Sequence, residues 1–323
     1  MCTRLQVYSE PSSGPGGALS MLLTNDAVCV LGAPIVVRLI RRLKLSPLPF
    51  LLGLATAANT GSVATLVGNP QNMLCASLGQ LGYRRHAALF VPVAILGLAL
   101  NYVLLLAAFP RELRGVRLEV LSDASDASDA SGRPWLTVAV IGATTAFYLS
   151  GADLAWSALA GWALLLLLRP REATDTFRRM DWSVVAFFAG LFVVVEGLVR
   201  SGVPAWLFSK FPLWPAGAGG PYAWARLAAV FLIGSNVVSN VPFIVVVSDQ
   251  IRALPDPKLG WELLAMASTF AGNLTLLGSV ANVIVAESGG EVGGIGYLAY
   301  LRVGAPLAIL TTALGTVWLL LAW

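Results

Sequence analysis

A polar stretch from Ala55 to Asn72, ATAANTGSVATLVGNPQN, lies between apolar helical segments of the chain. The 323 residues are 57% hydrophobic and only 12% charged, which is the composition of a membrane protein. Backbone at membrane depth must be hydrogen-bonded within its own segment, so Gly- and Asn-rich chain is tolerated there only where protein buries it or where it lines a cavity. The stretch therefore predicts a discontinuous membrane helix at a binding site.

A second copy of this stretch, ASTFAGNLTLLGSVAN, lies 210 residues further on, at 267–282. Among the residues that align at this offset, Ala57, Thr65, Gly68 and Asn72 fall on the identical Ala267, Thr275, Gly278 and Asn282. Each copy follows a short polar tip inside an apolar run, LTND at 23–26 and VSNVP at 238–242. We therefore expect an all-α polytopic membrane protein of two repeats, each with a re-entrant hairpin and a discontinuous transmembrane helix.

Composition predicts four parts of the chain. Residues 1–18 contain no apolar core of signal-peptide length and are expected to be disordered. A first repeat at 19–109 is followed by a linker at 110–134, which contains three Ser-Asp-Ala triplets, and by a second repeat at 135–323. Apolar chain begins almost at the first tip, so the first hairpin is expected to be incomplete. Either the true start lies upstream or the chain is a natural truncation, and this form is expected to be poorly active.

Positive charge predicts the orientation in the membrane. Twelve of the 21 Lys and Arg residues fall in three loops, 38–44, 110–134 and 169–179, which the predicted spans place on one face. The positive-inside rule makes this face cytoplasmic, although Arg84 and Arg85 then lie outside. The two hairpins open on opposite sides in this arrangement, so the repeats are inverted. We expect a multi-pass protein of the plasma (inner) membrane.

Several other classes of protein find little support in the sequence. The three cysteines form no CxxC and the chain has one histidine, His86, so disulfides and metal cofactors are weakly indicated. His86 follows Arg84 and Arg85 and is expected at the membrane interface. The charge of +4 comes mostly from the membrane loops, which excludes a nucleic-acid partner. The chain contains no HExxH, GxSxG or Walker motif, so we expect no enzyme and no cofactor besides a coupling ion.

The tips and breaks supply the expected site. A discontinuous helix has free N–H groups at the start of its second half, which attract anions, and free carbonyl groups at the end of its first half, which with Asn and Thr oxygens suit sodium. The predicted substrate and ion ligands are the polar and small residues Thr24, Asn25, Asp26, Asn59, Thr60, Ser62, Thr65, Gly68, Asn69, Asn72, Ser239, Asn240, Asn273, Thr275, Gly278, Ser279 and Asn282.

Within this set, Asn25 and Asn240 are possible sodium ligands, and the side chains of Asn25, Asn72, Asn240 and Asn282 are expected to converge on one cavity. Asp26 and Glu196 are possible coupling carboxylates, because acids in membrane segments are costly unless they function. Helix packing is the alternative role for each single Ser, Thr or Gly. Repetition at matched positions favours the site.

The same segments resemble the ion transporter superfamily, which includes arsenite permeases, sodium/proton antiporters and sodium-coupled citrate and dicarboxylate symporters. The resemblance rests on LLTNDAV (22–28), ATAANTGSVATLVGNPQN (55–72), SNVVSNVPF (235–243) and GNLTLLGSVANVIVAE (272–287). The dicarboxylate branch has Ser-Asn-Thr at both tips, whereas this chain has Thr-Asn-Asp and Ser-Asn-Val, and the acid is more similar to the arsenite and antiporter branches. The resemblance implies a homodimeric scaffold in the bilayer and an elevator-like transport domain.

The expected function is secondary active transport of a small anion, a carboxylate or an inorganic oxyanion, coupled to sodium or protons. A passive anion channel, the membrane subunit of an arsenite-type efflux pump with a separate ATPase, and a sodium/proton antiporter are the alternatives. The repeated polar breaks favour the transporter.

Overall fold

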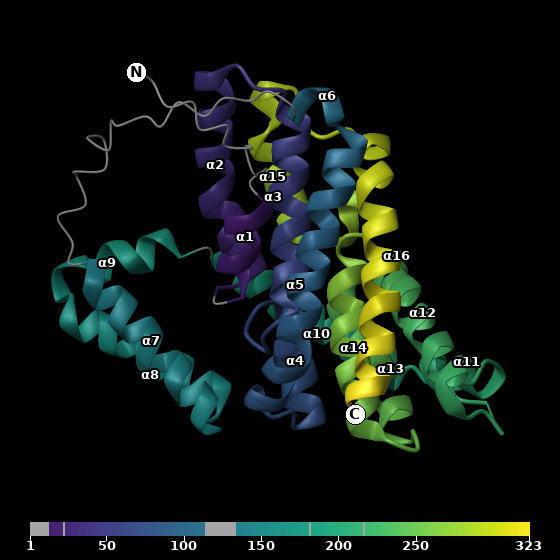
Figure 1. The fold of residues 1–323 in the computed structure, drawn as a ribbon. Helices are drawn as coiled ribbons and strands as arrows, with labels where there is room; N and C mark the ends of the chain where they lie inside the picture. Colours follow the sequence, from purple (N-terminus) through teal and green to yellow (C-terminus); the bar gives the residue numbers. More distant parts are fainter. Residues whose placement is uncertain (1–12, 22, 114–133, 181, 216) are drawn as a thin grey trace. The chain divides into compact units, whose positions relative to one another are not determined.

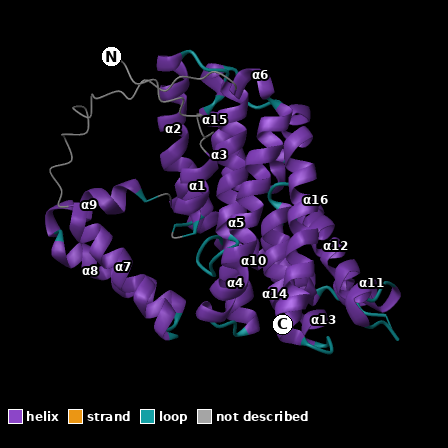
Figure 2. Ribbon diagram, in the orientation of Figure 1, coloured by secondary structure: helices purple, strands orange, loops and turns teal. Residues whose placement is uncertain are grey.

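The fold comes from a computed structural model, which describes the chain except for residues 1–12, 22, 114–133, 181 and 216 (Figure 1). Every regular element in the described residues is a helix (Figure 2). The chain divides into two compact units, 1–117 together with 197–323, and 118–196. Most of the predicted linker lies outside the described residues.

The first part of the larger unit contains both predicted polar features. Its helices are α1 (Ser13–Ser20), α2 (Asn25–Leu43), α3 (Pro47–Ser62), α4 (Pro70–Gly79), α5 (Tyr83–Ala108) and α6 (Pro110–Leu113). Prolines occupy the first turns of α3 and α4, where a missing N–H costs nothing. Helix α3 is buried from Pro49 to its end, and the break at 63–69 separates it from α4. The break of the first discontinuous helix therefore lies inside the protein core.

The second part repeats this plan. It consists of α11 (Val203–Lys210), α12 (Gly220–Val238), α13 (Asn240–Arg252), α14 (Pro257–Ala271), the 3-10 turn η2 (Leu276–Gly278), α15 (Val280–Ser288), the turn η3 (Gly290–Val292) and α16 (Tyr297–Ala322). Helix α14 is buried from Leu259 to Ala271, as α3 is. Helix α4 packs on α14 and α13, while α15 packs on α3 and α2. Each second half-helix thus contacts the other repeat.

The smaller unit holds α7 (Pro134–Ser150), α8 (Leu154–Leu168), α9 (Pro170–Arg179) and most of α10 (Trp182–Arg200). Gly151 turns the chain with φ +91°, and the carboxylate of Asp153 caps α8 by accepting a hydrogen bond from the Trp156 N–H. Helices α7 and α8 pack together as the predicted hairpin. Both helices are apolar, with many exposed large side chains.

Three described helices, α5, α12 and α16, are long and apolar enough to cross a membrane. A fourth candidate is the bent pair Ala189–Arg200 and Val203–Lys210, with 57° between its halves. The prediction of disorder at 1–18 is wrong for its last six residues, which belong to α1. Helix α1 packs on α3 because Gly17 and Gly61 face each other, and a Cβ on Gly61 would collide with the Gly17 carbonyl.

Candidate functional site

The side chain of Asn59, on α3, lies at the centre of the polar residues. Its Oδ1 accepts hydrogen bonds from Asn25 Nδ2 at 2.8 Å and from Ser279 Oγ at 3.0 Å. Its Nδ2 donates to Asn273 Oδ1 at 3.1 Å and to Asn282 Oδ1 at 2.8 Å. The side chain uses its full hydrogen-bonding capacity while 1% exposed. It therefore joins the first tip to the second break.

An amide closes each break in the same way. The bonds run from Asn72 Nδ2 to the carbonyls of Ser62 and Thr65 at 3.2 and 3.0 Å, and from Asn282 Nδ2 to those of Gly272 and Thr275 at 2.7 and 3.3 Å. Each donor and each acceptor in the second set lies 210 residues after its counterpart in the first set. The Ser62 and Gly272 carbonyls lie at the ends of the first half-helices, and those of Thr65 and Thr275 lie in the breaks, where no helix supplies a partner. The aligned asparagines thus satisfy backbone that lipid would reject.

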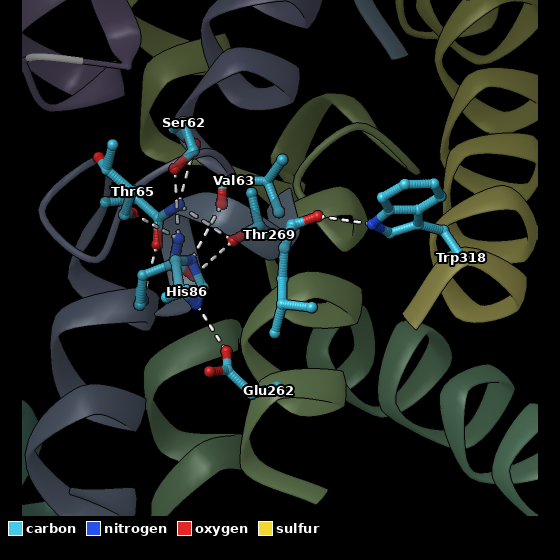
Figure 3. A network of polar contacts seen from close by, with 10 residues as sticks. Ser62, Val63, Thr65, His86, Glu262, Thr269 and Trp318 are labelled. Atoms are coloured by element: carbon cyan, nitrogen blue, oxygen red, sulfur yellow. Dashed lines mark hydrogen bonds and ion pairs between the residues drawn. The ribbon is translucent and has the colours of Figure 1, made fainter. Parts of the chain in front are cut away.

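Matched bonds also cross between the two copies. They are Asn59 Nδ2 to Asn282 Oδ1 and Thr269 Oγ1 to Asn72 Oδ1, together with Ser279 Oγ to Asn59 Oδ1 and Asn69 Nδ2 to Thr269 Oγ1. Asn59 and Thr269 are again 210 residues apart, as are Asn69 and Ser279. Figure 3 shows Thr269 beside Ser62 and Thr65 of the first break. The two breaks therefore form one network, in which equivalent residues of the two copies make equivalent hydrogen bonds to the other copy.

The two hairpin tips contact the breaks. The backbone N–H of Asn25 donates to the Gly68 carbonyl at 2.8 Å, and Asn240 Nδ2 donates to the Gly278 carbonyl at 3.2 Å. A Cβ at Gly68 would collide with the Ser62 backbone, so only glycine permits this close turn. Each tip thus abuts the break of its own repeat, and helices α2, α4, α13 and α15 all begin at these contacts.

The tips differ in how their asparagines are satisfied. Asn25 Oδ1 accepts from the Asp26 N–H, and its Nδ2 is bound to Asn59. Asn240 Oδ1 is buried with no hydrogen-bond partner in the described chain. Ser239 precedes it with φ +79° and ψ 146°, a backbone region that is costly for any residue except glycine. A strained turn thus presents an unpaired amide oxygen at the second tip.

Asp26 lies at the start of α2, where Thr24 caps the helix. Its carboxylate lies near the backbone N–H of Ala281, in the first turn of α15. A carboxylate at a helix N-terminus is stabilised by the helix dipole. The equivalent position in the second tip is Val241, so this contact has no charged counterpart there.

The remaining predicted residues are placed as follows. Thr60 accepts from Asn273 Nδ2, Thr65 Oγ1 donates to the Met21 carbonyl, and Thr275 Oγ1 donates to Asn236 Oδ1. Glu196 is exposed on α10, at the end of the smaller unit. Its role as a coupling residue stays a prediction.

Four polar residues of the network escaped the sequence analysis, namely Thr56, Asn101, Asn236 and Thr269. Thr56 and Asn101 bond to each other at 3.1 Å, and Thr269 joins the two breaks. Thr269 aligns with Asn59 at the 210-residue offset, which was the signal that could have found it. Asn101 lies in the apolar helix α5, outside the repeated stretch, and the residue 210 positions further on is Thr311.

His86 is buried inside the protein, so its ring faces neither lipid nor water, and its depth in the membrane stays a prediction. Its Nδ1 lies 2.6 Å from Glu262 Oε2, and its Nε2 lies 3.1 Å from the Val63 carbonyl (Figure 3). The ring also contacts Phe90, one turn along α5, with the ring centroids 4.6 Å apart and the planes tilted by 48°. Glu262 was not singled out from the sequence, because a lone acid near a helix start resembles an ordinary first-turn carboxylate.

Long apolar helices around two interlocked, polar helix breaks define a polytopic membrane protein with the architecture of a transporter. A sequence model of the citrate transporter family matches residues 13–271. The chain belongs to this family. It is therefore an integral membrane protein with a transport role.

Individual relatives agree with this assignment. A putative transporter, arsB, of Dictyostelium discoideum is 27% identical over 92% of the chain and 72% of its own length. The silicon efflux transporter LSI3 of Oryza sativa subsp. japonica is 27% identical over 92% of the chain and 75% of its length. A 46 kDa membrane protein of Mycobacterium leprae is also 27% identical, over 94% and 74%.

Proposed function

We propose that the chain is a secondary active transporter that moves a small anion, a carboxylate or an inorganic oxyanion, coupled to sodium or protons. The observation that carries the proposal is the meeting of four helix N-termini, those of α2, α4, α13 and α15, at one amide network. Helix N-termini attract anions through unpaired N–H groups and the helix dipole. An anion can thus be held at membrane depth without a basic side chain.

The oxygens of the network suit the coupling ion. Asn240 Oδ1 is buried and unpaired within the described chain, and amide oxygens are ligands that hard cations accept. The strained Ser239 fixes the turn that carries it. A sodium ion at this tip would lie close to the α13 and α15 N-termini, where its charge would favour anion binding. Asp26, at the first tip, supplies the alternative in which a proton is the coupling ion.

The family and the relatives suggest which substrates to test first. The family is named for citrate, one relative is named a silicon efflux transporter, and another is a putative transporter named arsB. We would reconstitute the purified protein in liposomes and measure uptake of labelled citrate, arsenite and orthosilicate under an imposed sodium or pH gradient. Uphill accumulation of any probe supports the proposal.

The same assay separates the alternatives. A passive channel gives flux and current that stop when the probe concentrations are equal on both sides. A pump subunit gives no uphill accumulation until an ATPase and ATP are supplied, and an antiporter exchanges sodium for protons with no probe present. Each of these results would contradict the proposed coupling.

A further inference from the structure

His86 and Glu262 form a buried pair of ionisable side chains that lies outside the amide network. The two side chains are 0% and 1% exposed. They lie on different helices, α5 and α14, and the imidazole also reaches the Val63 carbonyl directly after α3. The pair therefore connects the first break with the first half of the second discontinuous helix.

The two contacts determine how many protons the pair holds. A carbonyl oxygen only accepts, so Nε2 of His86 carries a hydrogen that it donates to Val63. Nδ1 and Oε2 at 2.6 Å then need one hydrogen between them, because two lone pairs would otherwise face each other. The pair is neutral overall, whether this hydrogen resides on nitrogen or on oxygen. Loss of this proton leaves a buried carboxylate with no donor in the pair, which is strongly unfavourable.

The other titratable groups near the pair either interact with other partners or carry no charge. Lys258, one turn before Glu262, donates to the carbonyls of Gly79 and Gln80. The Arg85 guanidinium lies 3.9 Å over the Trp323 ring. On α4 the facing titratable group is the buried thiol of Cys75. On α13, which packs on α14 and α4, Asp249 and Arg252 are exposed and pair with each other.

The elements that complete the surroundings add no charge at the pair. Helix α3, from Pro47 to Ser62, contains no titratable side chain, and Arg226 of α12 donates to the carbonyls of Pro212 and Leu213. Helix α16, which packs on α5 and α14, carries Arg302 and the buried Tyr300. The shared proton therefore balances the Glu262 charge by itself.

The pair is not part of the repeat. Positions 210 residues away from Glu262 and His86 are Leu52 and Gly296, neither of which titrates. The matched asparagines serve both breaks alike, whereas this pair acts on the first break only. An asymmetric ionisable group attached to one break can give that break two states, with and without its proton.

We propose that His86 and Glu262 form the proton-binding site that couples transport, which makes the proton a coupling ion of this transporter. The inference rests on the proposed function. The pair takes up one proton from water on one side of the membrane and holds it between Nδ1 and Oε2 in the packed state. It releases the proton to water on the other side when the first break moves away and the carboxylate becomes hydrated. Uptake and release return both groups to their starting state, so one proton crosses in each cycle.

The first test observes the site without transport. His86 is the only histidine of the sequence, so ¹⁵N-histidine labelling of protein with a histidine-free tag gives one imidazole in the NMR spectrum. We expect a proton shared at Nδ1 in the wild type. Glu262→Gln replaces it with an amide N–H donated to an unprotonated Nδ1, which keeps the hydrogen bond. Raising the pH should remove the shared proton reversibly and without unfolding, through the state in which the first break has moved away and the carboxylate is hydrated. Loss only on unfolding, followed by far-UV circular dichroism, would overturn the proposal.

The second test measures coupling in proteoliposomes with citrate, arsenite and orthosilicate as probes. Glu262→Gln is expected to abolish uphill accumulation driven by a pH gradient and to retain exchange of probe across the membrane. Asp249→Asn, which neutralises an exposed carboxylate, should retain both. Accumulation in Glu262→Gln equal to wild type, or accumulation driven by sodium alone, would overturn the inference. If wild type accumulates no probe, the proposed function fails, and the NMR titration alone decides whether the pair binds a proton reversibly.

Discussion

Replacing Asn59 with alanine should weaken the joint between the two repeats. The change removes four hydrogen bonds, and it leaves Asn282 Oδ1 and Asn273 Oδ1 without the donors that the structure gives them. Both asparagines are 0% exposed, and a buried acceptor left unpaired costs about 1–3 kcal/mol. Two such acceptors predict a loss of about 2–6 kcal/mol in the free energy of unfolding, on the same principle. Asn25 Nδ2 and Ser279 Oγ lose their acceptor as well, so the loss should fall in the upper part of this range.

The measurement is equilibrium unfolding in mixed micelles, followed by tryptophan fluorescence. Thr145→Val is the control, because the exposed Thr145 hydroxyl bonds only to the Ile141 carbonyl of its own helix. We expect the control to remain within about 0.5 kcal/mol of wild type, as surface substitutions usually do. An Asn59→Ala protein as stable as the control would refute the reasoning, because the network would then contribute nothing to joining the repeats.

Three further substitutions and one labelling experiment test separate parts of the site. Asn240→Ala should lower the apparent affinity for sodium, measured by uptake kinetics, by about one to two powers of ten, since a hydrogen bond or ligand to a charged group is worth about 1.5–3 kcal/mol; unchanged affinity would exclude this oxygen as a ligand. Asp26→Asn should reduce the dependence of uptake on the driving ion or on pH without unfolding the protein. Unaltered dependence in a folded variant would show that this carboxylate only stabilises the N-terminus of α15. Gly68→Ala should prevent correct folding, seen as loss of the monodisperse peak in size-exclusion chromatography, while Gly82→Ala, with open space around it, should behave as wild type; two equal profiles would contradict the tight turn. Cysteines placed at 122–130 and 171–179 should react with impermeant reagent only from the cytoplasmic side, and labelling from outside would overturn the orientation.

The sequence predicted the parts of the fold that depend on local chemistry. Pro47 and Pro70 indicate where the half-helices begin, and the structure starts α3 and α4 at these prolines. Thr24 and Asn69, which the sequence analysis named only as ligands, cap α2 and α4 through their side chains. Repetition identified Asn72 and Asn282 as equivalent, and the structure gives them equivalent bonds. These features can be predicted because each depends on residues within about ten positions.

Features formed by distant residues could not be predicted in this way. Glu262 and His86 are 176 residues apart, and nothing near either one indicates the other. The Gly/Pro/Ser-rich residues of α1 favour disorder by composition, yet they form a helix because glycine allows α1 to pack closely on α3. Whether the two repeats are inverted depends on the membrane, so it stays a prediction from loop charge.

The most direct test of ion-coupled transport is the accumulation ratio of a transported probe before and after its gradient is collapsed. Proteoliposomes holding the wild-type protein are loaded under a sodium or pH gradient with citrate, arsenite or orthosilicate, and an ionophore is then added. We predict that the internal concentration rises above the external one and falls back to equality after the ionophore. Internal concentrations that never exceed the external ones, with rapid equilibration, would contradict the account and show a passive pathway.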